Sequence, residues 1–158
     1  MGNGVPRGLH TVTASITVDD GKAAIEFYKK AFGAEVAMCM LSPGNGAVAH
    51  AELKIGDSAI FLNDEFPQSK VHSPRKLGGT TGGLQLYVDD CDAWHKRAVD
   101  AGCTNTMSPA DMFWGDRMSQ VTDTFGHVWG ISTNKEQLSE AELARRSEEF
   151  WKQLSGGK

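Results

Sequence analysis

The sequence lacks several features that mark common classes of protein. Its three cysteines have no C-x-x-C spacing, which argues against a disulfide framework and a zinc knuckle and favours a reducing cytoplasm. No basic run is interleaved with aromatic residues, and 16 Lys and Arg stand against 20 Asp and Glu, so no nucleic-acid partner is expected. No apolar run is long enough to span a membrane, and no apolar signal core follows the first residues. We therefore expect a stable, soluble cytoplasmic domain.

The sequence contains an internal repeat. Residues 15–35 alternate in polarity, as a strand does, and then show apolar residues at helical spacing before a glycine ends the helix. Residues 83–104 repeat this plan, so that Val88 corresponds to Val18, 70 positions earlier. Short alternating segments separated by turn residues follow each helix. Each half therefore predicts a strand, a helix and three further strands.

Two such halves predict an α+β fold of paired βαβββ modules that enclose a cavity, because each open, curved sheet leaves its concave face unfilled. We expect one domain over residues 1–136, made of repeats at 9–66 and 82–136. Residues 137–158 then form a C-terminal amphipathic helix and tail. The connection between the repeats, residues 63–83, is rich in glycine and reads either as a lid or as a plain linker.

The C-terminal segment carries its own helix signals. Ser139 and Glu142 are spaced as a capping box. An apolar stripe follows at helical spacing, made of Leu143, Phe150, Trp151 and Leu154. We expect this stripe to pack on the protein's own sheet or on a second subunit rather than on a membrane, because the polar face mixes acidic and basic residues.

Three segments of the chain resemble a known family. They are VDD…EFYKKAFGAE, AHAELKIGDSAIFLND and FWGDRMSQVTDTFGHVWGIST, and the likeness spans roughly residues 9–136. They are similar to the glyoxalase/bleomycin resistance protein/dioxygenase (vicinal oxygen chelate) superfamily, and specifically to its PhnB-like branch. The resemblance implies paired βαβββ modules, a homodimer and a cavity between modules. In members that do chemistry, it also implies a divalent metal held by His, Gln or Glu on the first and last strand of each module.

The positions that the resemblance assigns to metal ligands do not carry ligands in this sequence. Aligned by its repeats, the chain places Thr13 and Gly83 on the first strands, Ile60 or Phe61 on the last strand of the first module, and Gly130 on the last strand of the second. Glycine and isoleucine offer no donor, and one threonine hydroxyl does not hold zinc or nickel alone. We therefore expect no metal and no other cofactor. No glycine-rich loop for S-adenosylmethionine follows either first strand, so a methyltransferase is not expected.

Two pairs of residues are candidates for the site. His50 and Glu52 alternate along one predicted strand, so their side chains share a face. They form an acid–base pair or two ligands of a relocated metal, unless they are an ordinary ion pair on a solvent-facing strand. Trp114 and Arg117 together suit a planar or anionic ligand, with an aromatic face beside a guanidinium group. The alternative for Trp114 is structural packing.

Three other residues and one pair of cysteines receive structural interpretations. Asp123 is expected to be a hairpin-turn residue, and His127 to lie in the core or in a dimer contact. Cys39 and Cys103 are expected to be small buried side chains, and His95 to lie on an exposed helix face without a role.

The vacant ligand positions and the retained aromatic residues favour a dimeric protein that binds a small, partly aromatic, antibiotic-like molecule. An enzyme of lyase, isomerase or dioxygenase type, with a non-standard site around His50 and Glu52, is the alternative, so whether the protein catalyses a reaction stays open. A purely structural dimerisation module fits the terminal helix but leaves the cavity unexplained.

Overall fold

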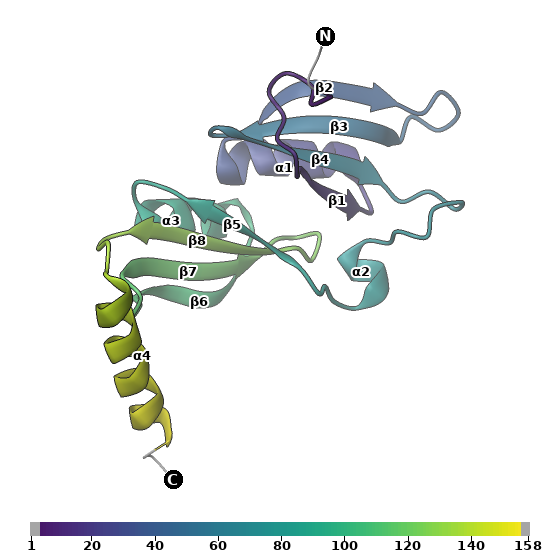
Figure 1. Cartoon of the computed structure of the whole chain (residues 1–158). Helices are drawn as coiled ribbons and strands as arrows, with labels where there is room; N and C mark the ends of the chain where they lie inside the picture. The colour runs from purple at the N-terminus through teal and green to yellow at the C-terminus, as the bar shows by residue number, and fades with distance from the viewer. Residues whose placement is uncertain (1–3, 156–158) are drawn as a thin grey trace.

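The computed structural model describes residues 4–155 and contains two modules of the same plan (Figure 1). The first module comprises β1 (Ala14–Val18), α1 (Gly21–Phe32), β2 (Glu35–Leu41), β3 (Val48–Ile55) and β4 (Ser58–Asp64). The second comprises β5 (Gly83–Tyr87), α3 (Cys91–Ala101), β6 (Thr104–Asp111), β7 (Asp116–Thr122) and β8 (Val128–Asn134). A short helix, α2 (Pro74–Leu77), interrupts the connection, and α4 (Glu140–Ser155) follows the second module. The first three residues of the expected domain and the last three of the expected tail lie outside the described residues.

The two sheets have matching topology. Sheet A has the strand order β1-β4-β3-β2, and sheet B has the order β5-β8-β7-β6. In each sheet the first and last strands of the module pair in parallel, and the remaining neighbours are antiparallel. This correspondence confirms the α+β fold of paired βαβββ modules that the internal repeat predicts.

The two long module helices begin and end by the same signals. The Asp20 carboxylate accepts a hydrogen bond from the backbone of Ala23 at 3.0 Å, and Asp90 does the same for Ala93. Gly33 ends α1 in the left-handed region at φ 65°, which glycine adopts at little cost. Repeated capping residues in the sequence therefore become repeated helix boundaries in the structure.

Asp64 fastens the start of α1 to sheet A. Its buried carboxylate accepts hydrogen bonds from the backbone nitrogens of Gly21, at 2.5 Å, and Val48, at 2.6 Å. A Cβ atom at position 21 would lie 2.7 Å from Cβ of Val48, so only glycine fits there. Asp64 is thus a structural residue of the first module.

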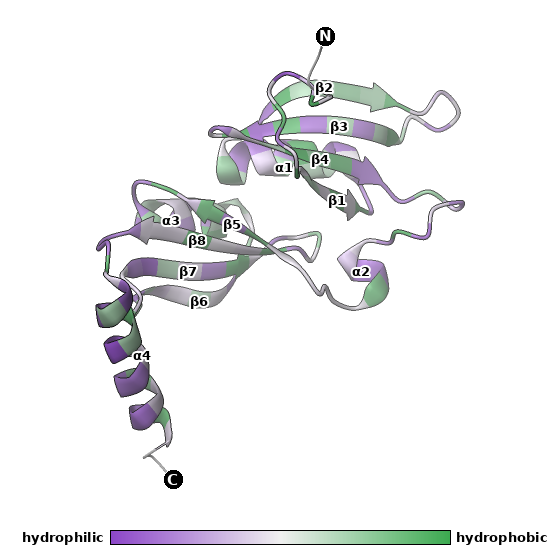
Figure 2. Ribbon diagram, in the orientation of Figure 1, coloured by the Kyte–Doolittle hydropathy of each residue, from purple (hydrophilic) through white to green (hydrophobic). Residues whose placement is uncertain are grey.

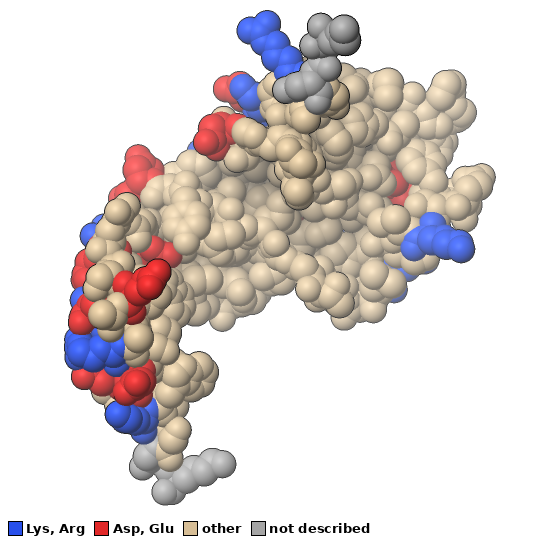
Figure 3. All heavy atoms as spheres, in the orientation of Figure 1, with Lys and Arg blue, Asp and Glu red and all other residues tan. Residues whose placement is uncertain are grey.

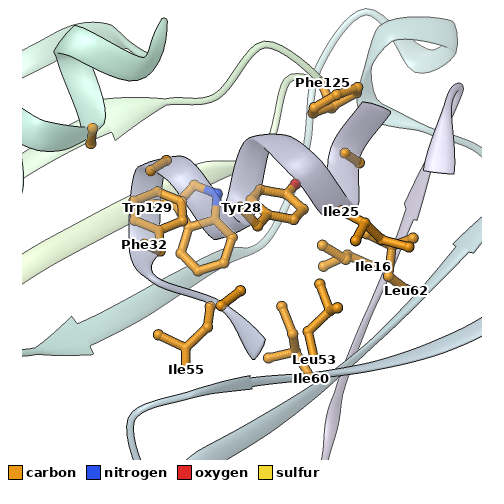
Figure 4. Packing of buried hydrophobic residues seen from close by; sticks show 14 of the residues in the cluster. Ile16, Ile25, Tyr28, Phe32, Leu53, Ile55, Ile60, Leu62, Phe125 and Trp129 are labelled. Atoms are coloured by element: carbon orange, nitrogen blue, oxygen red, sulfur yellow. The ribbon is translucent and has the colours of Figure 1, made fainter. Parts of the chain in front are cut away.

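The two modules pack through their helix-covered faces. α1 contacts α3, and Trp129 of β8 reaches across to α1, where its ring lies 4.4 Å from the ring of Phe32 and 5.5 Å from that of Tyr28 (Figure 4). All three rings are almost fully buried. Burial of several aromatic side chains at one place contributes strongly to the hydrophobic stabilisation of the pair of modules.

Asp123, in the turn between β7 and β8, is the polar centre of this contact. One carboxylate oxygen accepts the hydroxyl of Tyr28 at 2.7 Å and the indole nitrogen of Trp129 at 2.8 Å. The other oxygen accepts the backbone nitrogens of Phe125 and His127 at 2.8 and 2.9 Å. Burial, with the nearby carboxylate, raises the pKa of Tyr28. Asp123 is therefore a turn residue, as expected, that also ties α1 to sheet B.

Two structural expectations are wrong. Cys39 is exposed, because β2 is the edge strand of sheet A and no element covers it. His95 is buried rather than exposed, and burial lowers its pKa. Cys103 is buried as expected, and desolvation raises its pKa to about 12. His127 lies in the core, where its Nε2 contacts the backbone oxygen of Thr17 at 3.0 Å.

α4 projects away from the two modules (Figure 1). Its first turn is capped by the Ser139 hydroxyl, which accepts the backbone nitrogen of Glu142 at 3.3 Å. No residue of α4 is buried, so its apolar stripe does not pack on the protein's own sheet. The helix touches the body at its side, where Arg146 pairs with Glu136 at 2.7 Å. Within residues 4–155, no helix is long and apolar enough to cross a membrane.

Candidate ligand-binding site

Each sheet has one face against its helix and one face without a helix, which we call its open face. The modules lie side by side with β1 of sheet A near β5 of sheet B, and Figure 1 looks onto the open faces of both sheets, with α1 and α3 behind them. The open face of sheet B carries mostly polar side chains from β5, β7 and β8, together with one tyrosine and one methionine: Gln85, Tyr87, Asp116, Met118, Gln120, Ser132 and Asn134.

Asp116, at the start of β7, accepts hydrogen bonds from two aromatic side chains. Its carboxylate accepts the hydroxyl of Tyr87 at 3.0 Å, the indole nitrogen of Trp114 at 3.2 Å and the side-chain nitrogen of Asn134 at 2.9 Å. Asp116 is only 5% exposed, whereas Tyr87 is 67% and Trp114 37% exposed. The hydrogen bond from Tyr87 to the carboxylate raises the pKa of the phenol, which stays neutral. The rings are therefore held at their polar edges and remain accessible to a ligand.

The backbone around Trp114 is fixed from two sides. The ring of Phe113 meets the Trp114 ring edge-on at 5.0 Å. The oxygen of Gly115 accepts the backbone nitrogens of Lys135 and Glu136 at 2.9 and 3.0 Å. Gly115 has a φ of 96°, and a Cβ atom there would lie 2.5 Å from the Glu136 oxygen, so no other residue fits without distortion. This geometry holds Trp114 in a defined position.

Arg117 lies on the other face of sheet B. Its guanidinium group binds Asp92 of α3, with one contact at 2.8 Å, and Asp111 of β6 at 3.0 Å. These hydrogen bonds raise the pKa of Arg117 and lower that of Asp92. Successive residues of a strand point to opposite faces, so Arg117 and Asp116 point apart. The structure does not bring Trp114 and Arg117 together as a clamp.

His50 and Glu52 share the open face of sheet A, as the alternation predicts. Nε2 of His50 lies 3.6 Å from a carboxylate oxygen of Glu52, and both side chains are half-buried. The imidazole meets the ring of Phe61 edge-on at 4.8 Å. Within one chain, this pair belongs to sheet A, whereas Trp114 lies beside sheet B.

The positions that the resemblance assigns to metal ligands make other contacts in the structure. Gln85 pairs with Gly130, and a Cβ atom at 130 would lie 2.0 Å from the Gln85 side-chain oxygen, so the amide fills the space above the glycine. The same amide donates to the hydroxyl of Ser132 at 2.9 Å. Thr13 precedes β1, and its hydroxyl donates to the backbone oxygen of His10. Across residues 4–155, no group of three or more His, Cys, Asp or Glu is placed to hold a metal ion. This donor set does not fit the superfamily's metal.

Two cavities lie between the modules. One, of about 760 Å³, lies among β1, β5 and the connection around α2, and includes His72 and His127. The other, of about 770 Å³, lies among the β3–β4 turn, β5 and α3, and includes Trp94 and Trp129. Tyr87 also lines the second cavity, whereas His50, Glu52, Trp114 and Arg117 line neither. The connection does cover the first cavity, so both its lid and its linker interpretations stay open.

Tyr87 is the site residue that sequence reasoning missed. The alternation of Gln85 and Tyr87 with the apolar Leu84 and Leu86 indicates that the polar pair faces away from the core. Nothing local in the sequence shows that the partner of Tyr87 is Asp116, 29 residues later.

In Figure 3, charged side chains gather along α4, whereas the middle of the same face carries almost none.

Comparison with known proteins identifies the family. The Glyoxalase/Bleomycin resistance protein/Dioxygenase superfamily matches residues 8–131. The Mycobacterium tuberculosis protein Rv0887c is 38% identical over 131 residues, which cover 81% of this chain and 76% of that protein. A gene product of Arabidopsis thaliana has a TM-score of 0.62 at 28% identity over 78% of this chain and 98% of that one. A PhnB protein from Bacillus cereus shares the fold, with a TM-score of 0.60 at 13% identity over 78% of this chain and 99% of that one. The chain therefore belongs to this superfamily.

Proposed function

We propose that the protein is a homodimer that binds a small molecule on the open face of sheet B, without a metal. The observation that carries the proposal is the cluster in which the buried Asp116 carboxylate holds the edges of Tyr87 and Trp114 and leaves their rings exposed. Exposed aromatic rings on a soluble protein are common contact points for ligands when they are held rigidly. The free thiols of the chain suit a reducing cytoplasm.

The chemistry of the cluster favours a flat ligand that is neutral or positively charged. Both rings offer their π faces, which attract other rings and cations. The guanidinium group of Arg117, which an anionic ligand would need, is already bound by two carboxylates on the other face. Asp116 carries the nearest formal charge to the rings, and that charge is negative.

The homodimer is supported by the uncovered faces of a single chain. Sheet A presents Phe61, His50 and Glu52 on its open face, and sheet B presents Tyr87 and Trp114 on its own. A second copy that covers sheet B with its sheet A would bury both faces and place the His50–Glu52 pair near the ligand. A two-fold dimer makes this contact twice, once in each direction.

The ligand position is tested with thioflavin T, a flat aromatic cation that becomes fluorescent when it is held rigidly. We expect saturable binding that weakens about tenfold or more in Trp114→Ala, because an anchoring ring contributes roughly 1 to 3 kcal/mol. Tyr87→Ala is expected to weaken binding similarly. Arg117→Lys is the matched control, because Arg117 faces α3. The affinity of this variant for thioflavin T is expected to equal that of the unaltered protein. Unchanged binding in both Trp114→Ala and Tyr87→Ala, with folding intact by circular dichroism, would overturn the proposal.

A second function, catalysis at His50 and Glu52, is favoured by one observation. The imidazole and the carboxylate lie 3.6 Å apart on one face, half-buried against Phe61, which suits transfer of a proton to or from a bound molecule. If His50→Ala abolishes a measurable turnover of the co-purified ligand while binding survives, an enzyme replaces the binding protein. Native mass spectrometry and elemental analysis of protein purified without chelator identify that ligand and any metal.

A further inference from the structure

The cavity among β1, β5 and α2 is lined by no acidic residue, lysine or arginine within residues 4–155. Its volume of about 760 Å³ falls in the usual range for small-molecule pockets. Its polar side-chain atoms come from the imidazoles of His72 and His127 and from serine and threonine hydroxyls, whereas Leu77 and Leu84 add aliphatic surface. A charged ligand would lose its water here without gaining an oppositely charged partner. The wall therefore suits an uncharged ligand with both polar and apolar parts.

His127 leaves one ring nitrogen for a ligand. Its Nε2 lies 3.0 Å from the backbone oxygen of Thr17, and a carbonyl oxygen only accepts, so Nε2 carries a proton. In the neutral imidazole, Nδ1 is then an acceptor. No hydrogen bond among residues 4–155 uses this Nδ1, although His127 is only 9% exposed and lines the cavity. The ring is thus held in place with one acceptor left over, which fits a ligand that carries a donor.

His72 provides a second polar atom without a hydrogen bond. Its Nδ1 is buried and has no hydrogen-bond partner in the part of the chain that the structure describes. A carboxylate oxygen of Glu65 lies 3.9 Å from it, too far for a hydrogen bond. Glu65 is engaged elsewhere, since it accepts the backbone nitrogen of Ser73 at 2.6 Å and lies 3.3 Å from Lys76. The protein's own groups therefore do not fully satisfy the polar side of this cavity.

One side of the cavity is formed by residues 79–82, which we call the arm and which join α2 to β5. Within the described chain, the hydrogen bonds of the arm are local: the Gly79 nitrogen donates to the Pro74 oxygen at 2.9 Å, and the Thr80 hydroxyl donates to the Gly82 oxygen at 3.0 Å. Figure 2 shows this segment in pale colours, because glycine and threonine lie near the middle of the hydropathy scale. The arm thus has no strongly hydrophobic or charged side chain that fastens it to a module.

α2, in contrast, is fastened to both modules. Arg75 pairs with Asp19, directly after β1, at 2.7 Å. The Arg75 guanidinium also lies 5.5 Å from the centre of the Phe125 ring, in the turn between β7 and β8. In the same turn, a Cβ atom on Gly126 would lie 2.8 Å from Cβ of Pro74, so the two backbones are closely packed. The arm is therefore the part of the connection that can open while α2 stays in place.

We propose that this cavity is a second binding site, separate from the open face of sheet B, and that the arm is its gate. The ligand is an uncharged molecule with an apolar body and a hydroxyl donor, as in phenols and small alcohols. The hydroxyl donates to Nδ1 of His127, and the apolar body lies against Leu77 and Leu84.

The gate is tested by stopped-flow fluorescence with 2-naphthol, an apolar ring system that carries one hydroxyl group. Gly79 and Gly82 lie outside the left-handed region, and no described atom beyond their chain neighbours lies within 4 Å of a Cβ atom placed there, so alanine fits at both. Because alanine restricts the backbone, we expect the double variant Gly79→Ala/Gly82→Ala to bind and release 2-naphthol at least threefold more slowly. Gly44→Ala, in the turn between β2 and β3, has equal space and is the matched control. Equal rates in the two variants overturn the gate.

The position of the ligand is tested with two substitutions in the full-length protein. His127→Phe keeps a ring but removes Nδ1, and we expect at least tenfold weaker binding of 2-naphthol. Because this change also removes the donor to Thr17, Thr81→Trp is a second variant, which places an indole in the cavity from an exposed position on the arm and is expected to weaken binding similarly. Thr104→Trp, at an exposed position on β6, is its matched control. Unchanged affinity in both His127→Phe and Thr81→Trp overturns the site.

Equilibrium dialysis of the full-length protein tests the ligand chemistry and separates this site from the open face of sheet B. Naphthalene, which lacks the hydroxyl, is the matched partner of 2-naphthol. We expect saturable binding of 2-naphthol, at least tenfold weaker binding of naphthalene, and an unchanged affinity for 2-naphthol when thioflavin T is saturating. Equal affinities for the two compounds, no binding of 2-naphthol, or its displacement by thioflavin T would overturn the proposal.

Discussion

Replacing Asp123 by alanine removes the buried carboxylate that binds Tyr28 of the first module and Trp129 of the second. Four donors lose their partner, and two of them, the hydroxyl of Tyr28 and the indole nitrogen of Trp129, are buried side-chain groups. Each buried donor left without a partner costs about 1 to 3 kcal/mol. Loss of the buried carboxylate's own desolvation penalty offsets part of this cost. We therefore expect Asp123→Ala to lower the free energy of unfolding by about 3 to 5 kcal/mol, a large share of a typical domain's stability.

Two further variants calibrate that number. Tyr28→Phe removes one of the four hydrogen bonds and leaves three donors on the carboxylate, so we expect a loss of about 1 to 3 kcal/mol. Asp57→Ala is the matched control, an exposed turn aspartate whose carboxylate accepts only the Ser58 hydroxyl among described contacts, with an expected change within about 0.5 kcal/mol. Urea unfolding followed by far-ultraviolet circular dichroism measures all three. If Asp123→Ala costs no more than Asp57→Ala, Asp123 does not join the modules as described.

Two other predictions concern thiols and acid. In the native protein, we expect Cys39 to react with a thiol reagent far faster than Cys103, because Cys39 is exposed and burial raises the pKa of Cys103 to about 12. Comparable rates for the two thiols would contradict the burial described. Arg145 and Arg146 lower the pKa of Glu142 from 4.5 to about 2, so its stabilising contribution is present above pH 4.5 and is lost as the pH falls toward 2. Helical circular dichroism is expected to fall over that interval in the native protein, with a smaller change in Glu142→Gln, and an identical acid profile in the two proteins would refute the role of Glu142.

The fold was predictable because its signals are local and occur twice. The N-cap aspartate and the terminal glycine of each module helix are visible in the sequence, and the structure uses them as caps. The alternation of His50 and Glu52 likewise gave their common face. Such patterns depend on residues a few positions apart, so a single sequence is enough to read them.

The site was less predictable because its geometry depends on strand pairing between distant segments. Sequence neighbours such as Trp114 and Arg117 end on different faces, since one lies in a turn and the other points toward α3. Tyr87 and Asp116 meet only because β5 and β7 both flank β8. The exposure of Cys39 and the burial of His95 similarly follow from which strand is at the edge and from module packing, which local patterns do not reveal.

The position of the ligand is tested most directly by fluorine NMR of protein labelled with 5-fluorotryptophan. The chain has four tryptophans, at positions 94, 114, 129 and 151, and Trp114→Phe assigns the resonance of interest. Addition of thioflavin T is predicted to shift or broaden the Trp114 resonance in a saturable way while the buried Trp129 resonance stays in place. Saturable binding that leaves the Trp114 resonance unmoved and shifts Trp94 or Trp129 would contradict the account and place the ligand in the cavity between the modules.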